Sequence, residues 1–260
     1  MKSIIQTPYI LIALMILSIG YMISCTHDDE IFAPSSAKIT RGNAVLLPGA
    51  AGDTSKFKLD KPHCNVMWAT NYLGAAGLLT GRFNQFGMAD VSDAEAISYT
   101  TTGQPLPDVD WAFYENDPTK TFFNGYVQMN TSNTGEPARD GGCSLTSLGT
   151  VPVVAGTQNL TIQNIARIKT TKVEFDPASN GYIVTLDLTW KGNLSAPLTK
   201  SIVGKLAYIP RKKVQFGTAG AYDVFGLQLR FEFNCRDFGV TSTSISDNFQ
   251  IECNMNFHNK

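Results

Sequence analysis

The sequence predicts an all-β protein with antiparallel strands, and three features lead to this prediction. Apolar and polar residues alternate over several stretches of nine or more residues, including 182–190 and 225–235. Alternation with a period of two places the apolar side chains on one face of a strand. No long amphipathic helix is available to cover a sheet. The apolar faces must therefore cover one another, in a sandwich or a closed barrel, and a barrel also removes exposed strand edges.

The first 24 residues have the pattern of a lipoprotein signal peptide. Lys2 precedes an almost wholly apolar run over 9–23, which is shorter than the ~20 residues of a membrane-spanning helix. The run ends at "MISC", which resembles a bacterial lipobox and implies cleavage before Cys25 and acylation of that cysteine. A cytoplasmic membrane anchor that retains its signal is the alternative.

Residues 25–56 are expected to form the lipid anchor and a flexible linker, because Pro, Ser, Gly and Ala dominate there without periodicity. The acidic tract 28–30 follows the anchor and resembles an export tag of surface-exposed lipoproteins in some Gram-negative bacteria; an ordinary solvated tether is the alternative. We therefore expect an outer membrane-anchored lipoprotein at the cell envelope, on its periplasmic or cell-surface side. One folded domain is expected over 57–260.

Within this domain, eight stretches have extended character, and turns or loops separate them. A long loop is expected over 88–110, with a helical turn at 92–97, and irregular structure over 135–160. The sequence "DPASNG" at 176–181 is a turn by composition. The expected strands lie at 64–68, 78–86, 121–132, 166–175, 182–192, 196–210, 225–235 and 248–257.

Cysteine usage fits an exported protein. If Cys25 carries lipid, an even four remain: Cys64, Cys143, Cys235 and Cys253. In an oxidising compartment we expect at least one disulfide among them. Cys235 and Cys253 could meet if the last two strands are neighbours, and Cys64 and Cys253 could meet where the first and last strands close a barrel. Buried free thiols would fit the apolar faces equally well. No histidine and cysteine spacing typical of zinc occurs, so no metal and no cofactor are expected.

Composition and motifs exclude several functions. The formal net charge is −1, and charged residues make up 17% of the chain. No basic block is long enough to follow a phosphate backbone, so nucleic acid is not an expected partner. The chain has no Gly-x-Ser-x-Gly elbow, no His-Glu-x-x-His and no phosphate-binding glycine loop. Its acidic residues are dispersed. An enzyme is therefore not predicted.

Five ordered pieces resemble a known family. They are "LDKPHCNVMW", "GLLTGRFNQF", "VQMNTSNTGEPARD", "YIVTLDLTWKGNLSAPLT" and "CRDFGVTSTSISDNFQIECNMNF". Together they resemble the YceI-like, polyisoprenoid-binding-like proteins over about residues 58–258. The resemblance implies an extended, lipocalin-like antiparallel β-barrel of about eight strands that holds a long apolar chain. The chain departs from the family in two places. The loop 88–110 is longer, and 141–164 replaces an aromatic-rich helical stretch that flanks the family's cavity, which leaves the ligand's identity open.

The apolar strand faces then become candidate walls of a lipid-binding cavity. Each ligand methylene removed from water contributes ~0.8 kcal/mol, so a long chain is needed to offset the cost of association. We expect binding or transport of an apolar lipid, such as an isoprenoid or fatty acyl chain, without catalysis. The alternative is an envelope interaction module whose barrel is filled by its own side chains. The expected cavity-lining residues are Trp68, Phe83, Met129, Leu186, Leu188, Trp190, Leu229, Phe231, Phe233 and Met255.

Two Arg-Asp pairs stand where strands give way to loops: Arg139 with Asp140, and Arg236 with Asp237. Such a pair could hold a polar head group at the mouth of the barrel. The favoured interpretation is structural, because Asp accepts backbone N–H groups in turns while Arg fastens a neighbouring loop.

Overall fold

The computed structural model of the chain describes the folded domain from Phe57 to Lys260, apart from several loop segments, and one short strand before it. The described residues are 44–45, 57–73, 77–91, 97–98, 108–114, 117–141, 159–160, 164–179, 181–215, 217–218 and 220–260.

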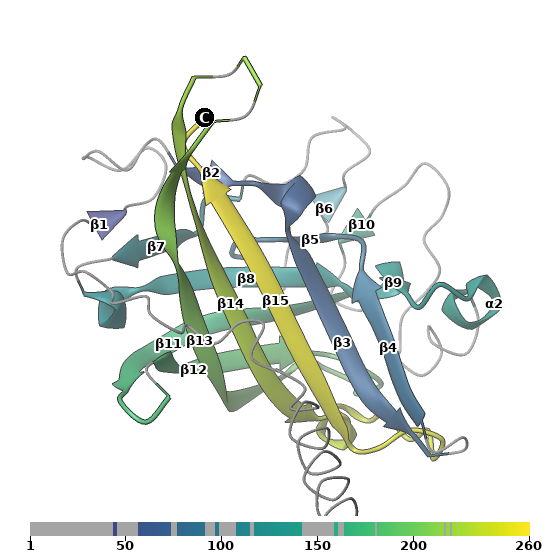
Figure 1. Cartoon of the computed structure of the whole chain (residues 1–260). Coiled ribbons are helices and arrows are strands. Elements are labelled where there is room, and N and C mark those ends of the chain that lie inside the picture. The colour runs from purple at the N-terminus through teal and green to yellow at the C-terminus, as the bar shows by residue number, and fades with distance from the viewer. Residues whose placement is uncertain are drawn as a thin grey trace, which may run out of the picture. The chain divides into compact units, whose positions relative to one another are not determined.

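In this described part, eight main strands form an antiparallel ring (Figure 1). Each strand pairs with the next main strand along the chain, except β4 and β8, which are joined through short strands. The last strand returns to pair with the first, since Ile251 lies opposite Trp68. Figure 1 shows β8 and β11 crossing behind β14 and β15, as two walls of a barrel do. The eight strands are β3 (Asn65–Tyr72), β4 (Gly77–Phe83), β8 (Phe122–Gln128), β11 (Ile165–Asp176), β12 (Gly181–Trp190), β13 (Leu198–Val214), β14 (Tyr222–Asn234) and β15 (Asn248–His258).

The ring closes through two short strands between β4 and β8. Strand β5 (Phe86–Gly87) continues the path of β4 and pairs with β8, and β9 (Ser132–Asn133) continues the path of β8 and pairs with β4. The backbone N–H of Asn84 donates to the Thr131 carbonyl at 3.1 Å, which joins the two segments between these pairs. The predicted antiparallel barrel of about eight strands is therefore confirmed. Between β4 and β8 the strand pairing is short, with two residue pairs in each of the two short strand pairs.

The predicted alternation is present in the central strands. Along β12, every second side chain from Tyr182 to Trp190 is buried, and the residues between them are partly exposed. On β14 and β15, Leu229 lies opposite Cys253 and Phe231 opposite Ile251, so the apolar faces of neighbouring strands are in register. Because this shared face points to the inside of the ring, the apolar side chains of successive strands meet there.

A cluster of aromatic rings fills one end of the barrel. Phe225 stacks on Phe257 with 4.7 Å between the ring centroids, and Trp111 lies 4.4 Å from Phe257. Trp111 belongs to β7 (Trp111–Tyr114), which pairs with β8 and with β1 (Ala44–Val45). The six residues that we call the aromatic plug are Phe57, Trp111, Phe113, Tyr208, Phe225 and Phe257.

Two glycines permit close approaches that this packing requires. Gly81 lies opposite Trp68 across β3 and β4, and a Cβ atom at Gly81 would stand 2.5 Å from the indole ring. Gly192, in the β12–β13 turn, has a φ of 51°, and a Cβ atom there would overlap the carbonyl oxygen of Phe238. A larger residue at either position would displace the neighbouring segment.

The segments expected to be irregular contain short elements. In the stretch 88–110, β6 (Ile97–Ser98) pairs with β10 (Asn159–Leu160), while the expected helical turn at 92–97 lies almost wholly outside the described residues. Helix α2 (Pro137–Asp140) follows β9, and β1 lies in the stretch expected to be a linker. β2 (Lys58–Leu59) pairs with β15. Among the described helices, none has the length and apolar character needed to cross a membrane.

Candidate functional site

The inside of the barrel beyond the aromatic plug is hollow. A cavity of about 510 Å³ lies there, lined by residues of all eight main strands. On β14 it extends from Leu227, next to the plug, to Phe233, and six residues of a strand span roughly 20 Å. The volume falls within the ~300–1,000 Å³ typical of small-molecule sites. The space is therefore long and narrow, with a closed end at the plug.

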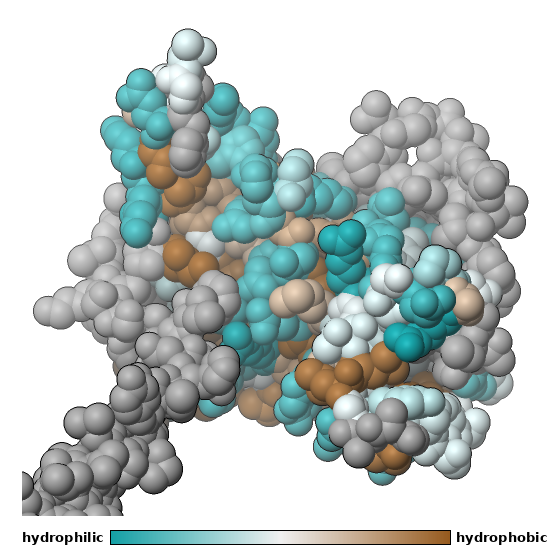
Figure 2. Space-filling model, turned by 45° about the vertical axis from the view of Figure 1, so that its right-hand side comes forward, coloured by the Kyte–Doolittle hydropathy of each residue, from teal (hydrophilic) through white to brown (hydrophobic). Residues whose placement is uncertain are grey.

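The cavity extends to the end of the barrel that carries the β3–β4 hairpin. Tyr72 and Leu78 line it and are 39% and 66% exposed, respectively. Ser242, Ser244 and Ile245, from the loop that follows β14, line the same end. Figure 2 turns the side of β3 and β4 forward and shows apolar residues, in brown, reaching the surface between hydrophilic and neutral ones. We call this end the mouth.

Nine of the ten residues expected at the cavity do line it. Leu186 does not, which corrects that expectation: it is completely buried and packs in the core beside the cavity. The alternation of β12 shows which face a side chain occupies but not where along the strand the hollow space ends. The nine lining residues are Trp68, Phe83, Met129, Leu188, Trp190, Leu229, Phe231, Phe233 and Met255.

Sequence reasoning missed the wall formed by β8 and its neighbours. Phe123, Gly125 and Val127 line the cavity, but both faces of β8 are largely buried, so no period of two is visible in "FFNGYVQ". The outer face is covered because Tyr126 packs in a second small cluster with Val91. The apolar residues of β15 were visible as an alternating series, and Phe249, Ile251 and Cys253 also line the space.

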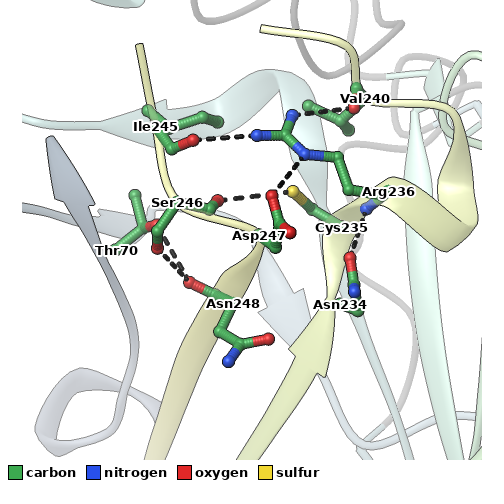
Figure 3. Close-up of polar contacts among 9 residues, drawn as sticks. All are labelled: Thr70, Asn234, Cys235, Arg236, Val240, Ile245, Ser246, Asp247 and Asn248. Carbon is green, nitrogen blue, oxygen red and sulfur yellow. Dashed lines mark hydrogen bonds and ion pairs between the residues drawn. The ribbon is translucent and has the colours of Figure 1, made fainter. Parts of the chain in front are cut away.

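Arg236 fastens the loop that forms part of the mouth (Figure 3). Its Nε donates to Asp247 Oδ1 at 2.8 Å, and its two terminal nitrogens donate to the carbonyls of Val240 and Ile245 at 2.9 and 2.8 Å. Thr70 Oγ1, on β3, donates to the Asn248 carbonyl at 2.9 Å. These bonds hold Val240 and Ile245 against the cavity and support a structural role for Arg236.

The members of the two Arg-Asp pairs have different surroundings. Asp237 forms an exposed ion pair with Lys200 at 3.2 Å. Asp140 accepts from the backbone N–H and hydroxyl of Thr134 at 3.0 and 2.8 Å, as expected of a turn-forming aspartate. Arg139 is different, because it lines the cavity and is the only charged residue among the described lining residues.

Two tryptophans supply the cavity wall with indole N–H groups. Trp68 Nε1 donates to the hydroxyl of Ser132, 3.0 Å away, which links β3 to β9. Trp190 Nε1 is buried and has no hydrogen-bond acceptor in the described part of the chain. The wall is otherwise apolar over most of its area, since its aliphatic, aromatic and sulfur-containing side chains come from every strand.

At least one disulfide was expected among the four cysteines, but Cys64, Cys235 and Cys253 are all free, which corrects that expectation for these three. Cys253 lies opposite Leu229 on β14, six residues from Cys235, and opposite Val66 rather than Cys64 on β3. Cys143 lies outside the described residues. Burial raises the pKa of the Cys253 thiol to about 12 and that of Cys64 to about 11, so both remain protonated at neutral pH.

No cluster of three or more His, Cys, Asp or Glu side chains suited to a metal ion occurs among the residues that the structure describes. Cys25 and the rest of the expected signal peptide lie outside those residues.

The fold and its hollow interior define an antiparallel β-barrel that encloses one ligand-sized apolar space. No family model and no curated protein matches the chain. Several solved structures are similar to it. BcnA from Burkholderia cenocepacia is 12% identical, with a TM-score of 0.45, over 76% of this chain and 99% of that chain.

Two further structures carry names of the family that the sequence pieces resemble. The Campylobacter jejuni YCEI protein is 17% identical, with a TM-score of 0.43, over 70% of this chain and 85% of that one. A polyisoprenoid binding domain from Saccharophagus degradans, implicated in plant cell wall breakdown, is 11% identical, with a TM-score of 0.43, over 79% and 99%. Because these similarities are distant, the function proposed below rests on the cavity of this chain itself.

Proposed function

We propose that this protein binds one long apolar lipid chain inside its barrel and carries or sequesters it without chemical change. The observation that carries this proposal is the cavity of about 510 Å³, closed at one end by aromatic rings and lined mainly by apolar side chains. At ~0.8 kcal/mol for each methylene removed from water, only a ligand with many methylene or methyl groups would bind tightly. Such attraction is not directional, so the cavity selects for length and width.

A filled barrel that serves as an envelope interaction module is the second candidate. The aromatic plug favours it in part, because one end of the barrel is filled by its own side chains. The cavity beyond the plug favours the lipid-binding function. Native mass spectrometry of the purified chain, before and after incubation with a fatty acid or a prenyl alcohol, distinguishes the two.

A cavity-filling variant gives the sharper test. Gly125 lines the cavity, and a Cβ atom there would stand 3.6 Å from Ile168 Cγ1, an ordinary contact. Gly125→Leu should therefore fold and occupy space that the chain needs, lowering lipid affinity at least tenfold. Val203→Leu, on the outer face of β13 where Val203 is 65% exposed, is the matched control and should bind as the unaltered protein does.

If Gly125→Leu does not fold, Ala166→Leu fills the cavity from β11 instead. Absence of any bound chain in the unaltered protein, or undiminished binding by a folded cavity-filling variant, would reject lipid binding and favour the interaction module.

We further propose that acylated Cys25 anchors the barrel at the outer membrane. The lipobox-like "MISC" and the short apolar run before it support this proposal. Metabolic labelling with an alkyne-bearing fatty acid should mark the protein, and Cys25→Ala should remove the label and release the protein from the membrane fraction. A labelled Cys25→Ala variant would contradict it.

A further inference from the structure

Arg139 is unusual among the residues around the cavity. It is partly buried, it lines an otherwise uncharged wall, and its guanidinium makes no ion pair and no hydrogen bond within the described part of the chain. Partial loss of hydration against an apolar wall costs free energy for an unpaired cation. An anion bound beside the guanidinium would offset that cost.

The turn around Arg139 fixes its backbone, while no described residue bonds its guanidinium. The Arg139 N–H donates to the carbonyl of Glu136 at 3.0 Å, and the Gly141 N–H donates to that of Pro137 at 2.9 Å. The two nearest carboxylates in sequence are already engaged in the turn. Glu136 accepts from the Ala138 N–H at 3.2 Å, and Asp140 accepts from Thr134. The guanidinium is therefore available to a ligand.

On these grounds we propose that Arg139 binds the anionic head group, a carboxylate or a phosphate, of the lipid whose chain fills the cavity. This inference rests on the proposed function and adds the chemical class of the ligand: an anionic amphiphile rather than a neutral hydrocarbon. The planar guanidinium matches both head groups, because its N–H donors can bond two oxygens of the same group at once.

The competing explanation is that Arg139 only covers the cavity edge with its aliphatic stem and keeps its charge in water. The two explanations differ in what they require of the ligand. A head-group contact requires the anion, whereas a covering stem does not distinguish an acid from an alcohol of the same chain.

The test compares ligands that share a chain and differ in charge. Equilibrium binding is measured by titration calorimetry with dodecanoate against 1-dodecanol, and with farnesyl phosphate against farnesol. We expect at least one anion to bind tenfold or more tightly than its alcohol, which corresponds to about 1.4 kcal/mol. Preference in only the carboxylate pair or only the phosphate pair would identify the head group.

The variant Arg139→Gln should abolish the preference and leave alcohol binding unchanged, while Arg139→Lys should keep part of it. Arg82→Gln removes an exposed arginine of β4 that does not line the cavity and should keep the full preference. If Arg139→Gln lowers the melting temperature, Arg139→Met, which retains an apolar stem, replaces it.

Equal binding of acids and alcohols by the unaltered protein, or a preference that persists in Arg139→Gln, would overturn the head-group assignment while leaving chain binding intact. If neither acids nor alcohols bind, the proposed function itself fails. The preference should also decrease with added salt, because Arg139 is only partly shielded from water.

Discussion

At the scale of single residues, the two tryptophans of the cavity wall form a natural comparison. Trp68 donates its indole N–H to Ser132, whereas the buried N–H of Trp190 has no acceptor among the described residues. A buried donor without an acceptor opposes folding, and a buried donor with an acceptor contributes to it. The same substitution should therefore have different effects at the two positions.

We predict that Trp68→Phe lowers the free energy of unfolding by about 1–2 kcal/mol more than Trp190→Phe does. In the first variant Ser132 loses its donor, and in the second an unpaired donor is removed. Chemical denaturation of both variants measures the difference. Equal losses would show that ring volume, not hydrogen bonding, dominates at both sites.

At the scale of elements, the loop between β14 and β15 shows how a segment between strands becomes part of a cavity wall. Arg236 makes three side-chain bonds to this loop, two of them to backbone carbonyls. Asp237, the next residue, makes only an exposed ion pair. Adjacent residues of one motif thus contribute differently to stability.

We predict that Arg236→Ala lowers the free energy of unfolding by about 2–3 kcal/mol, because charge-assisted bonds to the loop are lost. Asp237→Asn, the control in the same turn, should change it by less than about 1 kcal/mol. Thermal unfolding followed by circular dichroism measures both effects. An unchanged melting temperature in Arg236→Ala, together with lost lipid uptake, would assign Arg236 to ligand binding instead.

At the scale of the whole molecule, the barrel divides into a filled end and a hollow end. The plug combines rings that are far apart in the sequence, since Phe57, Trp111 and Phe257 belong to three separate segments. Because close-packed rings contribute much of the buried apolar area, the plug stabilises the barrel and also limits the length of the cavity.

We predict that Phe225→Ala, which removes the central ring of the plug, lowers the free energy of unfolding by about 3–5 kcal/mol. Phe175→Ala on β11 should cost about 1 kcal/mol or less, since Phe175 is 49% exposed. Denaturant titration of the two variants provides the comparison. A small loss in Phe225→Ala would indicate that the plug contributes little to the stability of the fold.

Alternation in the sequence was sufficient to predict which residues of β12, β14 and β15 face inward, because the period of a strand is set by local backbone geometry. Alternation without helices left a sandwich or a closed barrel, because apolar faces must then cover one another, and the family resemblance implied the barrel. Alternation was not sufficient on β8, because the cluster around Tyr126 buries the outer face of this strand as well. Nor did it separate Leu186, in the packed core, from Leu188, at the cavity.

The amino-acid sequence by itself determined the main strands and the inward faces of β12, β14 and β15, since these follow from local composition and period. Only the tertiary structure decided where the ring closes, how far the plug reaches and which arginine meets the cavity. Arg139 and Arg236 stand in the same Arg-Asp motif, and their different surroundings depend on segments brought together from distant parts of the chain. Contacts of that kind have no local signature, because they depend on three-dimensional packing rather than on spacing along the chain.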